Sequence, residues 1–107
     1  LADYVVAKHA LLGMMKCMAN ELGPSGICVN SISPSMVDTP LTESLPKKLK
    51  EIYQSQVPLE KRLAKPIDVA NIVQFLCSKN ANYTTNQQIR NYQSLAVKRG
   101  LKWAKTN

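Results

Sequence analysis

The stretch that decides the fold is residues 21–34, ELGPSGICVNSISP. It closes a long apolar segment, breaks it at Gly23 and Pro24, and continues as the short β-branched run 27–32. Glycine suits the left-handed position after a helix and proline cannot extend the helical hydrogen bonds, so a helix is predicted to end here. A strand that follows a helix after so short a link is typical of a layered α/β fold rather than a bundle.

The segment before this break is predicted to be a helix over residues 3–22. Twelve of the sixteen residues from Tyr4 to Ala19 are apolar, which leaves no continuous hydrophilic face. A helix of this kind is usually covered on more than one side. We therefore expect it to pack on a sheet and against a neighbour, with Gly13 allowing close approach.

The segment after the strand is predicted to hold a loop, two helices and a second strand. Residues 33–40 form a loop at the carboxyl end of the strand, where ligands bind in open α/β sheets. The first helix begins at Pro46 with Ser44 as its cap and ends at Pro58. The second helix begins near Pro66 and ends near Asn80, and residues 84–89 form the last strand. The apolar stripes of the two helices are Leu49, Ile52, Tyr53 and Val57, and Ile67, Ala70, Val73 and Leu76.

Composition and charge exclude several classes of protein. The 107 residues are 45% hydrophobic and 20% charged, which suits a folded domain, and no apolar run is long enough to span a membrane. The net charge is +7, but the last eighteen residues alone hold five cations and no acid. The basicity therefore belongs to one end of the chain.

The three cysteines, Cys17, Cys28 and Cys77, are widely spaced, and His9 is the only histidine. This pattern fits neither a disulfide framework nor a zinc site. We expect buried, reduced thiols in a cytoplasmic protein, no metal, and a histidine that is packed or lies at an interface.

The pair that carries chemistry is Tyr4 and Lys8, which lie one turn apart on the same face of the first helix. A nearby cation favours the phenolate form of a phenol, which prepares it to exchange a proton with a carbonyl or alcohol oxygen. This spacing is common by chance, and a packed ring with an extended lysine is the structural alternative.

Several motifs, in order, resemble the C-terminal half of the short-chain dehydrogenase/reductases. They are YVVAKHALLG (4–13), ELGPSGICVNSISP (21–34), VDTP (37–40), PL (58–59), PIDVANIVQFL (66–76) and YTTNQ (83–87). The resemblance implies an α/β fold, the C-terminal part of a Rossmann-type doubly wound parallel sheet, over residues 1–89. Residues 90–107 would be a basic tail or linker, or a frayed helix.

This resemblance implies an NAD(P)-dependent oxidoreductase that interconverts a ketone and a secondary alcohol. Tyr4 would be the general acid in reduction and the base in the reverse reaction. Lys8 would hold the nicotinamide ribose and favour the phenolate. The cofactor is NAD or NADP, with no choice between them.

The loop after the first strand would flank the nicotinamide. Pro34 and Ser35 stand at the family's Pro-Gly, the backbone of Val37 would meet the carboxamide, and Thr39 would reach the amide or the pyrophosphate. The following helix, roughly residues 41–57, is usually a mobile substrate lid. Ser35 replaces a glycine and would be strained if its φ were positive, whereas Asn86, which also replaces a glycine, tolerates positive φ well.

The sequence lacks the glycine-rich phosphate loop of the family and the Ser and Asn that precede its Tyr. We therefore expect the chain to carry half of an active site and to be inactive alone. The alternatives are a non-catalytic remnant that forms oligomers, and a tail that binds an acidic partner. Helices 3–22 and 66–79 would form a dimer or tetramer as in the family. We expect no membrane contact, and we favour a solvated tail over nucleic-acid binding.

Overall fold

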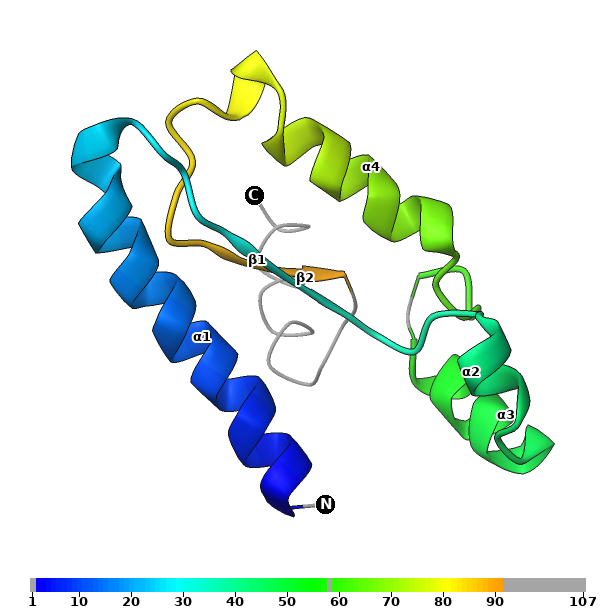
Figure 1. Cartoon of the computed structure of the whole chain (residues 1–107). Coiled ribbons are helices and arrows are strands. Elements are labelled where there is room, and N and C mark those ends of the chain that lie inside the picture. The colour runs from blue at the N-terminus through cyan, green and yellow to red at the C-terminus, as the bar shows by residue number, and fades with distance from the viewer. Residues whose placement is uncertain (1, 58, 92–107) are drawn as a thin grey trace, which may run out of the picture. The chain divides into compact units, whose positions relative to one another are not determined.

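The computed structural model describes residues 2–57 and 59–91. Its elements, in chain order (Figure 1), are α1 (Ala2–Leu22), η1 (Gly23–Ser25), β1 (Ser31–Pro34), α2 (Pro40–Glu43), α3 (Lys47–Gln56), α4 (Pro66–Leu76), η2 (Lys79–Ala81) and β2 (Gln88–Asn91). The predicted α/β fold with its Rossmann-type order of helix, strand, helix, helix and strand is confirmed, with α2 as an addition. Internal contacts divide the chain into two units, one of residues 1–32 and 71–89 and another that includes residues 33–70.

Helix α1 ends where the sequence predicts. The 3-10 turn η1 follows it directly, and Gly26 closes this turn with φ 75°, its N–H donating to the carbonyl of Gly23 at 2.8 Å. A positive φ costs glycine little because it has no Cβ. The Gly-Pro-Ser-Gly sequence therefore ends the helix and reverses the chain.

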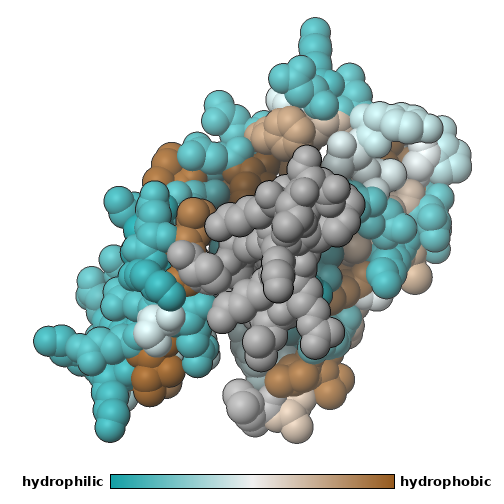
Figure 2. All heavy atoms as spheres, turned by 180° about the vertical axis from the view of Figure 1, so that it is seen from behind, coloured by the Kyte–Doolittle hydropathy of each residue, from teal (hydrophilic) through white to brown (hydrophobic). Residues whose placement is uncertain are grey.

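The expected coverage of α1 on several sides is not found among the described residues. Only Met15 and Ala19 are buried among its described residues, whereas Val6 is 68% exposed and Leu11 50% exposed. Among the described residues, no segment outside the helix's own backbone comes close to Gly13, so the expected close approach is not found there. Apolar side chains stand at the surface (brown in Figure 2) because the described residues supply no second layer against this helix.

The two strands form a small parallel sheet. Asn86 N–H donates to the carbonyl of Val29 at 2.8 Å and Ser31 N–H to that of Gln87 at 2.9 Å, so the paired numbers rise together. The strand predicted over 27–32 is observed as Ser31–Pro34, and that predicted over 84–89 as Gln88–Asn91. Just before both strands, side-chain bonds supply part of the pairing beside the backbone bond from Asn86 to Val29.

Asn30 and Thr85 supply these side-chain bonds. The Asn30 amide donates to the carbonyl of Thr84 at 2.9 Å and accepts from the N–H of Gln87 at 3.1 Å. The hydroxyl of Thr85 accepts from the N–H of Val29 at 3.0 Å. These bonds join segments more than fifty residues apart without regular strand geometry.

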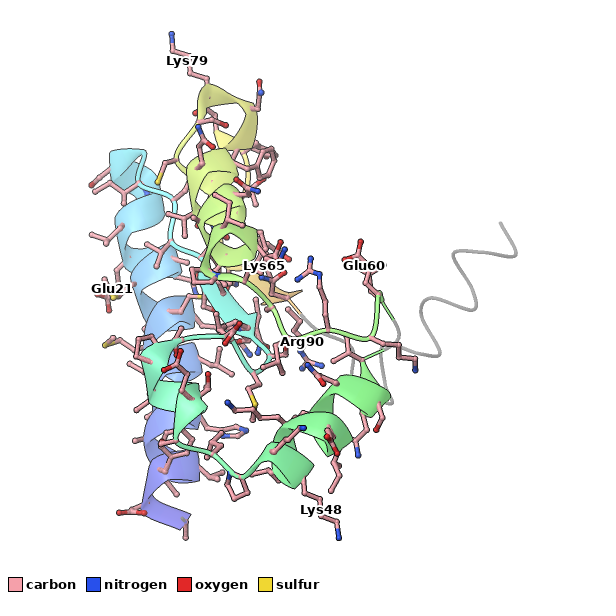
Figure 3. The ribbon with its side chains drawn as sticks, turned by 90° about the vertical axis from the view of Figure 1, so that its right-hand side faces the viewer. Glu21, Lys48, Glu60, Lys65, Lys79 and Arg90 are labelled. Atoms are coloured by element: carbon pink, nitrogen blue, oxygen red, sulfur yellow. The ribbon has the colours of Figure 1, made fainter. Side chains whose placement is uncertain are left out.

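The helix predicted from Pro46 is α3, but Ser44 does not cap it. The Ser44 hydroxyl instead donates to the carbonyl of Leu41 at 3.1 Å and ends the short helix α2. The predicted apolar stripe is only partly covered, since Leu49 is 38% exposed and Ile52 46% exposed. Lys48 and Glu60 project away from the ribbon (Figure 3).

Helix α4 starts at Pro66 as predicted but ends at Leu76, before Asn80. The Ser78 hydroxyl donates to the Phe75 carbonyl at 2.6 Å, and this local bond replaces the helical one. None of the residues of α4 is buried, and Ile67 on the predicted buried side is 57% exposed. Its apolar side has no covering layer among residues 2–57 and 59–91.

The expectation of buried cysteines is wrong. Cys17, Cys28 and Cys77 are free and exposed. In the described part of the chain, no helix combines the length and apolarity needed to cross a bilayer. The predicted tail from residue 92 onward lies outside the described residues, while Arg90 and Asn91 belong to β2.

Candidate active site

Tyr4 and Lys8 meet on the first turns of α1. The Nζ atom of Lys8 stands 5.6 Å from the centre of the Tyr4 ring, and the tyrosine is 59% exposed. A cation over an exposed aromatic ring contributes about 0.5–1 kcal/mol. This contact with the ring face uses no hydrogen-bond acceptor, so the N–H donors of the ammonium are available to a ligand.

His9 follows Lys8 but belongs to another face of the helix. Its Nδ1 donates to the carbonyl oxygen of Val5 one turn earlier, at 2.8 Å, and its side chain is exposed. The expected packing of His9 is not found within the described residues. Its hydrogen bond satisfies a backbone group of its own helix.

The predicted cofactor loop connects β1 to α2. Pro34 ends β1, and Val37 forms a parallel bridge with Ala64. This bridge rests on two bonds, from Ala64 N–H to the carbonyl of Met36 (3.1 Å) and from Asp38 N–H to the carbonyl of Ala64 (2.8 Å). The loop is therefore held by backbone pairing to a segment that follows α3.

Ser35 adopts no positive φ, so the strain that its side chain could have introduced is absent. Asn86, which stands at another glycine position of the family pattern, takes φ 61°. Asparagine is one of the residues that visit the left-handed region most readily. The two substitutions thus differ, because only one position requires the left-handed conformation.

Thr42 fastens the end of this loop to α2. Its hydroxyl lies 2.8 Å from the carbonyl oxygen of Val37, 2.9 Å from that of Thr39, and 3.0 Å from the N–H of Thr39. The bond from the Thr39 N–H is one half of a capping box at the start of the helix. The side chain that begins the predicted lid therefore also fixes the predicted cofactor loop.

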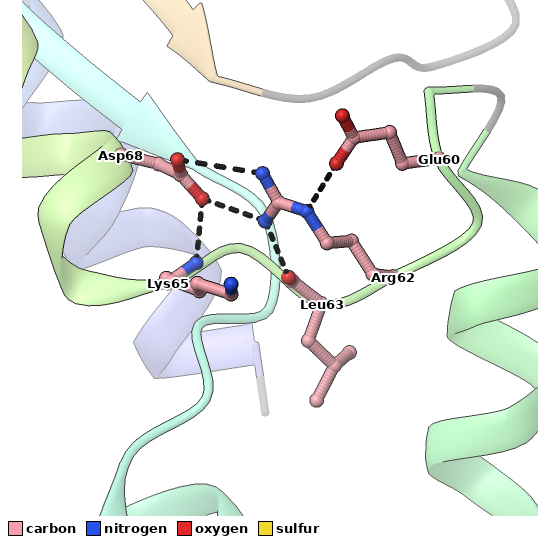
Figure 4. Close-up of polar contacts among 5 residues, drawn as sticks. All are labelled: Glu60, Arg62, Leu63, Lys65 and Asp68. Carbon is pink, nitrogen blue, oxygen red and sulfur yellow. Dashed lines mark hydrogen bonds and ion pairs between the residues drawn. The ribbon is translucent and has the colours of Figure 1, made fainter.

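Arg62 organises the segment that follows the predicted lid (Figure 4). Its guanidinium donates to Asp68 at 2.7 Å, to Glu60 at 2.6 Å and to the carbonyl of Leu63 at 3.0 Å. The planar guanidinium can serve several acceptors at once. The preceding turn contains two non-glycine residues with positive φ, Glu60 (57°) and Lys61 (50°), a conformation that needs such support.

The charges of this cluster affect one another. The hydrogen bonds from Arg62 and from the backbone N–H of Lys65 lower the pKa of Asp68 below its ordinary value of 3.8. The same bonds to Asp68 and Glu60 raise the pKa of Arg62. The carboxylate also accepts from the Lys65 N–H at 2.7 Å, close to the positive start of α4.

The predicted site residues fall into two groups, one in each unit. Tyr4 and Lys8 meet in the first unit, and Pro34, Ser35, Val37 and Thr39 form one continuous loop in the second.

Sequence reasoning missed Thr42 and Arg62. The Thr-x-x-Thr spacing at the start of α2 was a local signal for the capping box. Nothing local predicts the contact between Arg62 and Asp68. Among residues 2–57 and 59–91, no cluster of three His, Cys, Asp or Glu side chains could hold a metal ion.

Comparison with known proteins identifies the family. The sequence model of a protein family described as enoyl-(acyl carrier protein) reductase matches residues 1–91 of this chain. The chain belongs to the short-chain dehydrogenase/reductase family. The predicted resemblance to this family is thereby confirmed, and so is the assignment to a family of oxidoreductases with a Rossmann-type fold.

Relatives within this short-chain dehydrogenase/reductase family cover most of the chain. It is 39% identical over 87 residues to a 3-oxoacyl-(acyl-carrier-protein) reductase of Aquifex aeolicus and 40% identical to that of Thermotoga maritima, in each case 81% of this chain. It is 41% identical over 85 residues, 79% of the chain, to a 3-alpha-(or 20-beta)-hydroxysteroid dehydrogenase of Mycobacterium bovis. The matches span 30–35% of the length of these relatives.

Proposed function

We propose that this chain supplies the proton-transfer half of the active site of an NAD(P)-dependent oxidoreductase that interconverts a ketone and a secondary alcohol. The observation that carries the proposal is the exposed Tyr4 ring with the Lys8 ammonium over it, on the first helix of a short-chain dehydrogenase/reductase chain. The exposure of the Tyr4 side chain leaves it accessible to a substrate.

The substrate class follows from what the names of two relatives share. One relative is a reductase of a 3-oxoacyl group and the other is a dehydrogenase of hydroxysteroids. A ketone is the substrate in the first name and an alcohol in the second. The common chemistry is therefore the oxo–hydroxy pair, and we extend that chemistry, without the acyl or steroid part, to this chain.

In the proposed mechanism Tyr4 donates its hydroxyl proton to the substrate oxygen as a ketone is reduced. It accepts a proton from the alcohol in the reverse direction. Lys8 binds the ribose hydroxyls with its free N–H donors and stabilises the phenolate that Tyr4 becomes. The nicotinamide, when bound, supplies or accepts the hydride, and the protein orients it and manages the proton.

The residues of the loop fit a nicotinamide. Val37 offers its backbone N–H and C=O at the edge opposite Ala64, which suits a carboxamide with one acceptor and one donor group. Pro34 and Ser35 would flank the ring, and Thr39 would contact the amide or the pyrophosphate. The dinucleotide is NAD or NADP.

We propose that the 107 residues are inactive by themselves. A dinucleotide needs a glycine-rich turn at a helix N-terminus to bind its pyrophosphate, and this sequence contains none. Activity would therefore require a longer protein that holds this chain together with such a turn, and this longer protein is what we call the intact protein. A cytoplasmic location is also proposed, since the three free cysteines suit a reducing compartment.

A structural role is the second candidate, and one observation favours it. Apolar side chains remain exposed on both α1 and α4, for example Val6 at 68% and Ile67 at 57%. Exposed apolar surface of this kind is typical of surfaces that become buried against a partner. Helices 3–22 and 66–79 would then join two or four copies, with or without catalysis.

The test is an assay of the intact protein with NADH or NADPH and two ketones, a 3-oxoacyl thioester and a ketosteroid. Oxidation of the cofactor that depends on a ketone supports the proposed reaction. Tight oligomers with neither cofactor binding nor turnover would leave only the structural role. The same preparation, sized by sedimentation, decides between dimer and tetramer.

A further inference from the structure

The single hydroxyl group of Thr42 has three possible hydrogen-bond partners, and the chemistry of a hydroxyl limits which bonds it can make at one time. A hydroxyl has one proton and two lone pairs, so it can accept from the N–H of Thr39 while donating to one carbonyl at a time. The two carbonyls within reach belong to Val37 and Thr39, at 2.8 and 2.9 Å. Its side chain is half-buried, which protects these bonds from competition by water.

The bridge between Val37 and Ala64 sets the direction of the Val37 backbone. In a parallel bridge the bonds run from the residues on either side, here Met36 and Asp38, to the partner. The N–H and C=O of Val37 itself therefore both point away from Ala64, to the other edge of this extended segment. The Thr42 hydroxyl stands at that edge, against the Val37 carbonyl.

The peptide between Val37 and Asp38 is consequently fixed at both ends. Its N–H donates to Ala64 at 2.8 Å, and its C=O, 2.8 Å from the Thr42 hydroxyl, accepts the proton of that hydroxyl whenever it is not donated to Thr39. Because the peptide is planar, two opposed bonds prevent it from rotating. The carbonyl keeps a second lone pair, and the neighbouring Val37 N–H keeps its direction.

We propose that Thr42 is a positioning residue, whose hydroxyl fixes the N–H and C=O edge of Val37 against which the nicotinamide carboxamide binds. This inference rests on the proposed function, because it assumes that a nicotinamide binds at Val37. It adds that one side-chain hydrogen bond, from Thr42, connects α2, the first helix of the proposed lid, to the cofactor loop. Loss of that bond weakens recognition of the carboxamide and leaves the remainder of the dinucleotide unaffected.

The test compares Thr42→Val with Thr42→Ser in the intact protein. Valine keeps the shape and removes the hydroxyl, whereas serine keeps the hydroxyl. Binding of NADH or NADPH and of ADP-ribose, which lacks the nicotinamide, is measured by calorimetry. We expect Thr42→Val to weaken binding of the reduced cofactor about tenfold, or about 1.4 kcal/mol, to leave ADP-ribose binding unchanged, and to be rescued by Thr42→Ser.

Amide hydrogen exchange in the cofactor-free protein gives a second measurement. The Thr39 N–H, bonded to the Thr42 hydroxyl at 3.0 Å, should exchange faster in Thr42→Val and not in Thr42→Ser. If the valine variant does not fold, Thr42→Ala removes the same hydroxyl with less bulk and takes its place.

Three outcomes would overturn the inference. Equal weakening of cofactor and ADP-ribose binding would assign Thr42 a general structural role. Unchanged binding of both ligands would show that the hydroxyl does not matter for the carboxamide. If the wild-type protein binds neither cofactor, the proposed function itself fails, and the inference fails with it.

Discussion

Asn30 holds together two segments that are far apart in the sequence, and its removal should be costly. Its side-chain amide donates to the Thr84 carbonyl at 2.9 Å and accepts from the Gln87 N–H at 3.1 Å. Asn30→Ala removes both bonds and leaves two backbone groups without a partner. Each such bond contributes about 1 kcal/mol, so the free energy of unfolding should fall by about 2 kcal/mol.

A second substitution separates the two bonds. In Asn30→Asp one carboxylate oxygen can still accept from the Gln87 N–H, but the other faces the Thr84 carbonyl in place of a donor. We expect a loss at least as large as that of Asn30→Ala at neutral pH. The loss should shrink in acid, where the protonated carboxyl becomes a donor again.

The assay is equilibrium unfolding of the intact protein in urea, followed by circular dichroism. The matched control is Asn20→Ala, because Asn20 is an exposed asparagine of α1 and alanine is a better helix former. The control should match the wild type or exceed it slightly. If Asn30→Ala were as stable as the control, the two bonds would contribute nothing and the reasoning would be refuted.

The remaining predictions concern the proposed site and the cluster around Arg62. Tyr4→Phe in the intact protein should lower turnover at least a hundredfold while cofactor binding survives, since only the proton donor is lost; retained turnover in a stopped-flow assay would exclude the acid role. Lys8→Met should weaken both cofactor binding and rate, and an unchanged dissociation constant in a fluorescence titration would exclude the ribose contact. Because the folded-state pKa of Asp68 is lowered, the stabilisation from its pairing with Arg62 is complete above about pH 4 and lost as the pH falls through the folded value. The protection of the amides of residues 62–68 against hydrogen exchange, corrected for the intrinsic pH dependence of exchange, should therefore stay constant from pH 5 to 8 and fall below pH 4, more so in the wild type than in Asp68→Asn.

Local chemistry made the helix boundaries predictable at some ends. Gly23 and Pro24 stop α1 and Pro66 starts α4, because glycine and proline act through their own backbones. Ser44 shows the limit of this approach. A serine before a proline fits the start of one helix and the end of another equally well, and the contact with Leu41 decides the matter.

The strand boundaries and the burial pattern depend on distant partners. Residues before Ser31 look like a strand in sequence, but Asn30 and the Thr85 side chain supply part of the hydrogen bonds there. Helices α1 and α4 carry the predicted apolar residues, but the described residues contain no layer that covers them. The same limit applies to Thr42 and Arg62, whose importance comes from what they contact and not from a motif.

The proposed lid leaves and rejoins the rest of its unit at neighbouring points. Its stems meet through backbone bonds at Ala64, which depend little on residue identity, while Thr42 and Arg62 each support one stem from within. The intervening helices can therefore change in sequence, and even in length, without disturbing the geometry of the stems. Such an arrangement lets evolution exchange the substrate for a new one while the neighbouring chemistry stays the same.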